Sequence, residues 1–420
     1  MLILSGMIVV NVGADHINTY LKKKKYAKDE TTDGKAVEYW VNDLIKQGLL
    51  DVDDFEKFLF EELFFGKRKN IRFYKLDQVS ALKNPVTWLN HFKEKYDVNH
   101  LEFKNIMTSI PTTDRNSQIA AISSEIDRKG NISKIRILFA EYAEISEEGR
   151  LKVTVSYFPV EIDLNKKCMI IKDWNRQGLA EGYKSEMQLD HIVSILSMSF
   201  GVKTKSFKGK HKRTLHNMSR GLVNDVYEKI PSFKQIDQLD NAGREFQQKV
   251  LKTLPLENVV LDGKEYHLEK NVFDFNDELR KIIEKLCISD YFYNIPYEDI
   301  WHMGVETIVS KIKFKDLEHV LTILSGEASE TPIFCTKTFL SLKKSLEDAK
   351  MVERLWIEHD RESGMLSLSY DATKEEYLGM KILSNIRYTQ KDLETAEEIY
   401  NSYAGDTTEK VKRCNQRCAV

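Results

Sequence analysis

Alternation of apolar and polar residues between Ile132 and Ile171 constrains the fold of this chain more than any other feature. Polar turns interrupt the alternation at Glu147–Gly149 and at Asn165–Lys166. The alternating apolar positions are Ile135, Ile137, Phe139, Leu151, Val153, Val155, Tyr157, Val160, Ile162 and Leu164, followed by the run Met169–Ile171. A period of two with short polar turns predicts an antiparallel β-meander that buries one face.

After this meander, apolar residues recur at the spacing of two helices. Ser185 can cap a helix that ends at Gly201, and a second helix stops before Pro231. The apolar stripe of the first is Leu189, Ile192, Val193, Leu196 and Phe200, and that of the second is Leu215, Met218, Leu222, Val226 and Ile230. We expect the first helix to cover the buried face of the meander.

The flanking regions complete an α+β, multidomain fold class. Residues 1–125 predict a mostly helical domain, although the apolar N-terminal run is interpreted as a buried strand. Residues 126–232 hold the meander, two helices and a basic loop. Residues 233–410 predict an α+β domain, and 411–420 a polar tail.

Two hairpins are expected within residues 233–410. Asp262-Gly263 between two apolar runs is a strong signal for the first. For the second, a helix near Phe339 precedes a hairpin around Asp360–Gly364. Helix followed by hairpin is the order of a winged helix and of many other α+β domains.

Composition places the chain among intracellular globular proteins. Lys and Arg number 63 and Asp and Glu number 65, so bulk positive charge does not drive binding to polyanions. The five cysteines are odd in number and mostly far apart, which favours reduced thiols and a cytoplasmic location. The N-terminal apolar run is too short to span a bilayer, so we expect no membrane partner.

The strongest functional indication is a basic segment without acidic residues. Between His191 and Asn224 there is no Asp or Glu. Its candidate nucleic-acid-binding residues are Lys203, Lys205, Phe207, Lys208, Lys210, His211, Lys212, Arg213 and Arg220. The cations could release counterions from a polyanion, Phe207 could stack on an unpaired base, and His211 could gain charge below about pH 6.5. A solvated loop explains the same residues.

Three residues suggest a second hypothesis, a metal-dependent nuclease. Glu161 and Asp163 are two apart on an expected strand, so both carboxylates face one side and could share a divalent ion near Lys166. The lysine falls in a turn and not two residues after an acid. Polar residues on the solvent-exposed face of a half-buried strand explain the same residues.

We therefore expect a nucleic-acid-binding protein that is not an enzyme, since no catalytic or cofactor motif is present. It would act as a subunit of a DNA- or RNA-handling complex, for which prokaryotic antiviral defence is one context, with a protein partner or a second copy. The alternatives are the nuclease and a scaffold whose basic loop docks an acidic chain. No cofactor or resident metal is expected.

Overall fold

The computed structural model describes residues 2–26, 34–112, 117–147, 149–253, 259–266, 275–294, 296–316, 319–326, 331–384 and 387–405. Contacts divide the chain into two compact units. Unit 1 comprises residues 1–211 and 369–398, and unit 2 comprises residues 212–368 and 399–420. This division differs from the three consecutive domains that the sequence suggests. The tail expected at 411–420 lies outside the described residues.

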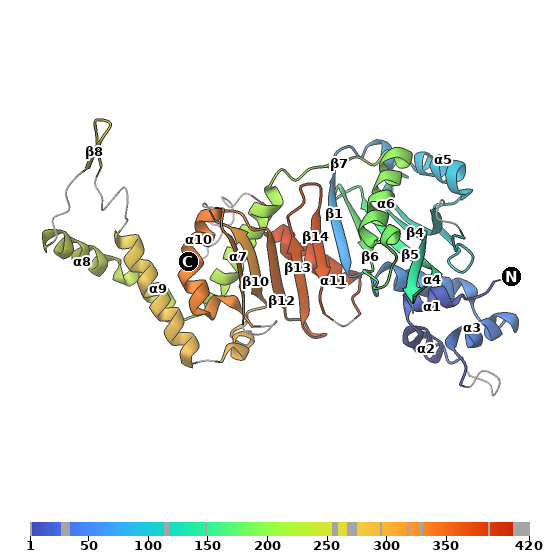
Figure 1. Ribbon diagram of the computed structural model, residues 1–420, viewed down its shortest axis with the longest axis horizontal. Helices are drawn as coiled ribbons and strands as arrows, with labels where there is room; N and C mark the ends of the chain where they lie inside the picture. The colour runs from blue at the N-terminus through green and yellow to red at the C-terminus, as the bar shows by residue number, and fades with distance from the viewer. Residues whose placement is uncertain are drawn as a thin grey trace. The chain divides into compact units, whose positions relative to one another are not determined.

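An antiparallel sheet forms the centre of unit 1 (Figure 1). Its order is β14-β1-β6-β5-β4-β3-β2, and the short β7 pairs with the end of β1. The strands are β1 (Asn70–Leu76), β2 (Phe103–Lys104), β3 (Gln118–Ile126), β4 (Ile132–Glu147), β5 (Arg150–Asp163), β6 (Cys168–Asp173), β7 (Thr204–Lys205) and β14 (Leu378–Ile382). Because β4, β5 and β6 are consecutive and antiparallel, the predicted meander is confirmed. The expectation that it buries only one face is wrong, because every residue of β6 is buried.

Helices α5 (Pro85–Tyr96) and α6 (Ser185–Phe200) cover one face of this sheet, as expected for α6. The Phe200 ring lies 5.4 Å from Trp88 and 5.2 Å from Phe92, measured between ring centroids. Burying each such aromatic side chain contributes about 1.5–3 kcal/mol. Gly201 ends α6 with φ of 67°, a conformation that favours glycine.

The N-terminal helices pack on the opposite face, and one of them corrects the sequence prediction. The strand expected at the N-terminus is wrong, because residues Gly6–Val12 form helix α1. Ser5 Oγ accepts a hydrogen bond from the Met7 N–H at 3.2 Å and caps the helix. Asn11 Nδ2 donates to the Val155 carbonyl at 2.9 Å and ties α1 to β5. An apolar run this short has no periodicity that separates strand from helix.

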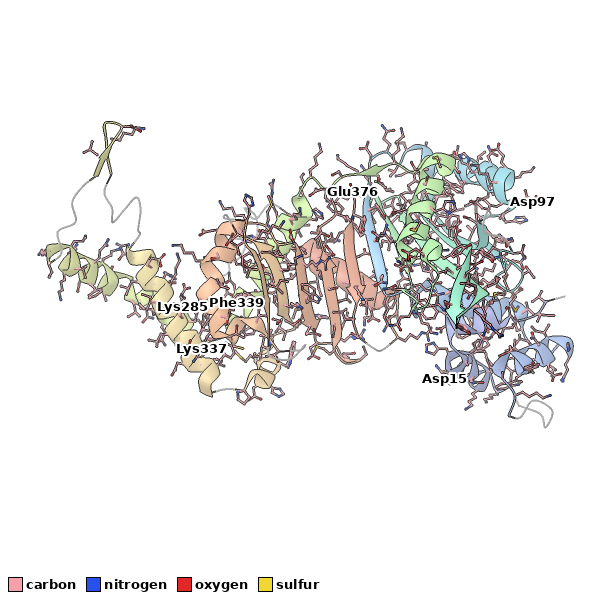
Figure 2. The ribbon with its side chains drawn as sticks, in the orientation of Figure 1. Asp15, Asp97, Lys285, Lys337, Phe339 and Glu376 are labelled. Atoms are coloured by element: carbon pink, nitrogen blue, oxygen red, sulfur yellow. The ribbon has the colours of Figure 1, made fainter. Side chains whose placement is uncertain are left out.

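The remaining α-helices of unit 1 lie mainly in its N-terminal part. They are α2 (Ala14–Lys23), α3 (Val37–Lys46) and α4 (Val52–Phe64), with most of α11 (Gln390–Ser402) near the C-terminus and short 3-10 turns at Ala81–Lys83 and Glu181–Tyr183. Asp97, which closes α5, adopts a left-handed φ of 53° (Figure 2).

Unit 2 combines helices with a second group of antiparallel strands in the order β11-β10-β12. Its elements are α7 (Lys210–Tyr227), α8 (Asp240–Thr253), β8 (Val259–Leu261), β9 (Lys264–Tyr266), α9 (Phe275–Asn294), β10 (Thr307–Lys315), β11 (Leu321–Ser325), α10 (Lys337–Ala349) and β12 (Arg354–His359), with 3-10 turns at Phe233–Leu239, Tyr297–Met303 and Ile333–Cys335. On α10, Phe339 is buried and Lys337 is exposed (Figure 2).

Both hairpins expected from the sequence are present. The first is β8–β9, which turns at Asp262 and Gly263 with φ of 49° and 73°. The second is formed by β12 and β13 (Leu366–Asp371). However, β12 pairs with β10 on its other side, with Arg354 opposite Lys313, so it is not part of an isolated two-stranded wing.

These elements confirm the α+β fold class, with antiparallel sheets packed on helices. The helix predicted to end before Pro231 is α7. Within the described ranges, no helix is long and apolar enough to cross a membrane.

Candidate nucleic-acid interface

The first part of the basic segment lies on unit 1, where β7 pairs antiparallel with the end of β1. Lys203, Lys205, Lys208 and Lys210 are all exposed. The Asp77 N–H donates to the Lys203 carbonyl at 2.9 Å and continues the pairing beyond β7. The backbone of this segment is thus held against the sheet while its ammonium groups face solvent.

Phe207 anchors the segment and does not face outward. Its side chain is only 1% exposed, and its ring stacks on His211 with a centroid separation of 4.7 Å. The Phe207 N–H donates to the Glu375 carbonyl at 2.8 Å. The Gly209 N–H donates to a Glu375 carboxylate oxygen at 2.7 Å. Phe207 therefore has no free ring face for a nucleic-acid base, and it acts by fixing the loop.

The two histidines of the segment are also interior residues. His211 is fully buried, and its Nε2 lies 2.7 Å from the Lys374 carbonyl. A carbonyl oxygen only accepts, so Nε2 carries the proton. Burial lowers the pKa of His216, whose Nε2 donates to the Leu346 carbonyl at 3.1 Å. His216 is therefore neutral at physiological pH and adds no charge for a polyanion.

A lysine outside the predicted segment joins this surface. The β1–β7 register places Lys75 directly opposite Lys205. Burial lowers the pKa of Lys75, and the charges of Lys210 and Lys205 lower it further. Like charges directly opposite on paired strands are destabilising. We call Lys75, Lys203, Lys205, Lys208 and Lys210 the lysine cluster.

Little acidic charge compensates this cluster. Lys203, Lys205 and Lys208 make no ion pair with any residue in the described part of the chain. Two acidic residues form backbone hydrogen bonds with this segment: Asp77, which is exposed, and Glu375, whose carboxylate accepts the Gly209 N–H. Concentrated positive charge of this kind attracts phosphates and releases their counterions.

The rest of the predicted segment belongs to unit 2 and lies on α7. Arg213 and Arg220 are exposed, and neither makes an ion pair among the described residues. Seven residues span two helical turns, so both guanidinium groups project from one face, roughly 10 Å apart along the axis. Lys212 is half-buried, and its carbonyl accepts the Val352 N–H at 3.1 Å.

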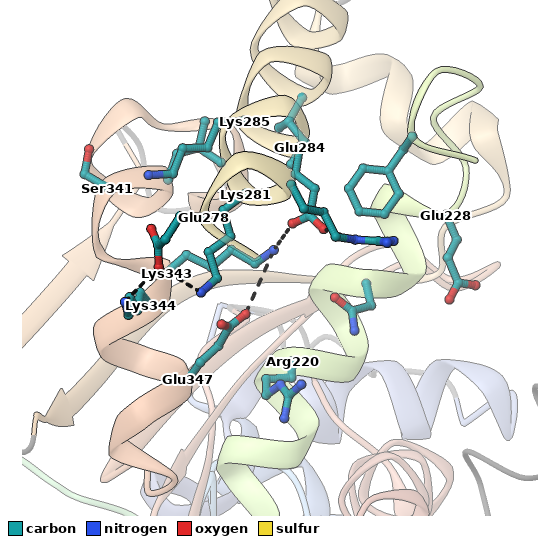
Figure 3. Close-up of a pocket in the computed structure, with 15 residues that line it drawn as sticks. Arg220, Glu228, Glu278, Lys281, Glu284, Lys285, Ser341, Lys343, Lys344 and Glu347 are labelled. Atoms are coloured by element: carbon teal, nitrogen blue, oxygen red, sulfur yellow. Dashed lines mark hydrogen bonds and ion pairs between the residues drawn. The ribbon is translucent and has the colours of Figure 1, made fainter. Parts of the chain in front are cut away.

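Arg220 also lines a cleft of about 540 Å³ between α7, α9 and α10 (Figure 3). Most charged groups there neutralise one another. Lys344 and Lys281 hold Glu278 at 2.8 and 3.3 Å. Lys343 and Arg280 hold Glu284 at 3.1 and 3.4 Å. The pairs made by Lys344 and Lys343 fasten α10 to α9, and those made by Lys281 and Arg280 lie within α9.

Three groups in the cleft have no ion pair among the described residues: Arg220, Lys285 and Glu228. Arg220 and Glu228 come from α7 and the turn that follows it, and Lys285 comes from α9 (Figure 3). The excess of positive charge is therefore small. The cleft extends the basic character of α7 without forming a separate anion cage.

The proposed nuclease carboxylates have structural partners. Arg136 Nε lies 2.7 Å from a Glu161 carboxylate oxygen, and Lys134 lies 3.9 Å from the other. Burial would raise the pKa of Glu161, but Arg136, Lys172 and Lys134 outweigh burial and lower it. Glu161 is thus an ionised carboxylate committed to cations within the sheet.

Asp163 and Lys166 shape the turn after β5. Asp163 Oδ1 accepts the N–H groups of Asn165 and Lys166 at 3.0 and 2.8 Å. Lys166 Nζ lies 3.2 Å from the Glu397 carboxylate. Among the described residues, no group of three His, Cys, Asp or Glu side chains has the arrangement of a metal site. The geometry gives the nuclease hypothesis no support.

No protein-family model matches this chain, and no curated protein matches it. Any function assigned to this basic surface therefore rests on the geometry of its residues. The sequence locates the exposed cations correctly by composition, because a solvated charge needs no particular tertiary partner. It misses Lys75, which joins the cluster only through pairing between β1 and β7. The one sign of Lys75 in the sequence is its place in the short apolar and basic run Ile71–Leu76.

Proposed function

We propose that this protein binds nucleic acid through phosphate contacts, without catalysing a reaction on it. The lysine cluster of unit 1 and the exposed arginines of α7 would make these contacts. The observation that carries the proposal is the placement of Lys75 opposite Lys205, in a cluster of which three lysines have no ion pair in the described chain. A bound phosphate backbone would relieve this repulsion.

The contacts would be independent of base identity. Lysine ammonium groups are point charges that suit phosphate oxygens and carry no base-edge pattern. The aromatic side chain within the segment is buried, so it adds no stacking. Affinity should therefore depend steeply on salt and weakly on sequence.

The test is fluorescence anisotropy with labelled duplex and single-stranded DNA and RNA over a salt series. The variant changes Lys203, Lys205 and Lys208 to Gln, since these side chains are exposed and have no ion pairs to lose among the described residues. On duplex DNA the slope of log affinity against log salt should flatten by about 2 to 3, at roughly 0.9 for each phosphate contact.

The matched control changes Lys22, Lys23 and Lys129 to Gln. These lysines are also exposed, lack ion pairs in the described chain and belong to unit 1. The control removes the same charge, so its slope should match the wild type. Equal slopes for all three proteins would contradict the proposal, as would the absence of binding at low salt.

A further inference from the structure

The strands of unit 2 carry a second basic surface on one side. The β10–β11 register places Lys313 opposite Ile323 and Lys315 opposite Leu321. The β10–β12 register places Lys311 opposite Trp356. Directly opposed residues share a face, so these side chains lie on the same side of three neighbouring strands. We call Lys311, Lys313, Lys315, Leu321, Ile323 and Trp356 the outer face.

The other side of these strands is the core of unit 2. Ile312, Phe314, Leu355 and Ile357 alternate with the outer-face residues and are buried. On the outer face, Leu321 and Ile323 remain 48% and 54% exposed. Trp356 is half-buried. The outer face therefore presents apolar and aromatic surface that the described chain does not cover fully.

Positive charge on this face exceeds its compensation. Lys313 and Lys315 share the single carboxylate of Glu353, at 3.3 and 3.6 Å. Lys311 makes no ion pair in the described chain, and its ammonium lies 5.1 Å from the centroid of the Trp356 ring. Farther along β12, Glu358 is buried and accepts a hydrogen bond from Ser310 at 3.3 Å.

We infer that the outer face binds an unpaired nucleic-acid strand, with a base stacked on Trp356 and phosphates held by Lys311, Lys313 and Lys315. This inference rests on the proposed function and adds the form of the ligand. Sheet faces with aromatic residues recognise single strands because splayed bases expose their rings, whereas a duplex hides them. Lys311 has a flexible stem, so its ammonium can leave the ring for a phosphate.

A protein partner fits the same observations less well. An extended peptide or a second copy would pair with the edge strand β11 and cover Leu321 and Ile323. Edge pairing does not explain the three lysines on β10 or the tryptophan on β12. Strand β12 lies two strand spacings, roughly 10 Å, from β11. A single strand laid across the face uses all three strands.

The experiment measures binding of the full chain to oligonucleotides of about 12 nucleotides, within the usual site size of single-strand-binding folds. Probes are labelled oligo-dT, oligo-U and a duplex of equal length. Trp356→Leu should weaken single-strand binding about 5- to 150-fold, the equivalent of losing roughly 1 to 3 kcal/mol of stacking, and leave duplex binding unchanged. Trp356→Phe should retain most of the affinity.

Trp301→Leu is the matched control, because Trp301 is a half-buried tryptophan of the same unit outside this face. Thermal unfolding confirms that each variant folds. If the Trp356→Leu variant binds single strands with wild-type affinity, the inference is wrong. A dimer seen by light scattering and dissociated by Ile323→Lys also overturns it, because a second copy would then occupy the face.

The two proposals fail separately. If the lysine-cluster variant binds duplex normally while Trp356→Leu loses single-strand affinity, the proposed role of the cluster falls and the outer-face inference stands. If the cluster variant loses salt-dependent binding while Trp356→Leu has no effect, the proposed role of the cluster stands and the outer-face inference is wrong. Wild-type protein that binds no probe at low salt removes both.

Discussion

At the scale of single residues, Lys172 on β6 is an ionisable group in an apolar environment. Its side chain is fully buried, and Nζ has no hydrogen-bond partner among the described residues. The ammonium lies 4.1 and 3.9 Å from the ring centroids of Phe64 and Phe65. Burial lowers its pKa to about 7, although Glu161 acts in the opposite direction. The aromatic faces stabilise the charged form only partly.

This pKa predicts how the stability of the chain varies with pH. The unfolded lysine holds its proton up to about pH 10.5, whereas the folded one loses it near pH 7. The unfolded state therefore binds more protons within that window, and the free energy of unfolding should rise with pH there. The contribution is at most about 1.4 kcal/mol for each pH unit.

Lys172→Met should remove this pH dependence and stabilise the protein below pH 7, because no charge then needs burial. Urea unfolding of the wild type and the variant at a series of pH values from mildly acidic to alkaline measures the effect. Lys22→Met, at an exposed site, is the control and should leave the pH dependence unchanged. Parallel curves for wild type and Lys172→Met would show that the lysine stays charged in the fold.

At the scale of elements, α7 packs closely against the end of the described chain. A Cβ added at Gly221 would lie 2.3 Å from a ring carbon of Tyr403. Tyr403 is held in place, since its hydroxyl donates to Asp225 at 3.5 Å. Glycine in a helix costs about 1 kcal/mol relative to alanine, so its presence here indicates a close contact.

Gly221→Ala should therefore destabilise the chain by about 1–3 kcal/mol through overpacking, despite the better helix propensity of alanine. In a Tyr403→Ala background the same substitution should become neutral or stabilising by up to about 1 kcal/mol, because the ring is gone. Urea unfolding of the wild type, the two single variants and the double variant gives the coupling free energy between the two positions. Equal effects of Gly221→Ala in both backgrounds would place the constraint elsewhere.

Elements with local patterns were predictable from the sequence, and those that depend on distant partners were not. The meander β4–β5–β6 and helix α6 follow from periodicity and end residues such as Gly201. Helix α1 was not predictable, because its apolar run depends on a cap at Ser5 and a contact with Val155. The burial of Phe207 likewise depends on Glu375, far along the chain.

At the scale of the whole molecule, unit 1 is discontinuous in sequence. Strand β14 pairs with β1, with Leu378 opposite Phe73, and this pairing brings residues 369–398 back to the N-terminal unit. Composition gives no sign of such a return. Consecutive domain boundaries are the natural expectation from a single sequence, because local patterns carry no information about which distant strands pair.

The division into units leads to a prediction about charge. The basic segment is shared, since Lys203–Lys210 belong to unit 1 and Arg213 and Arg220 to unit 2. Changing both arginines to Gln should flatten the salt slope on duplex DNA by about 2, and combining them with the three lysine changes should flatten it by about 4 to 5. The effects should add, because sites without shared partners act independently.

The control for this combined variant changes Lys22, Lys23, Lys129, Arg128 and Arg244 to Gln, all of them exposed and without ion pairs in the described chain. It carries the same net charge, so bulk electrostatics affect both proteins equally. A combined slope no flatter than that of the lysine variant alone would mean that the arginines of α7 do not contact the nucleic acid. Additive slopes would instead show that α7 neutralises phosphates in addition to those at the lysine cluster, although the chain as a whole carries a net charge of −2.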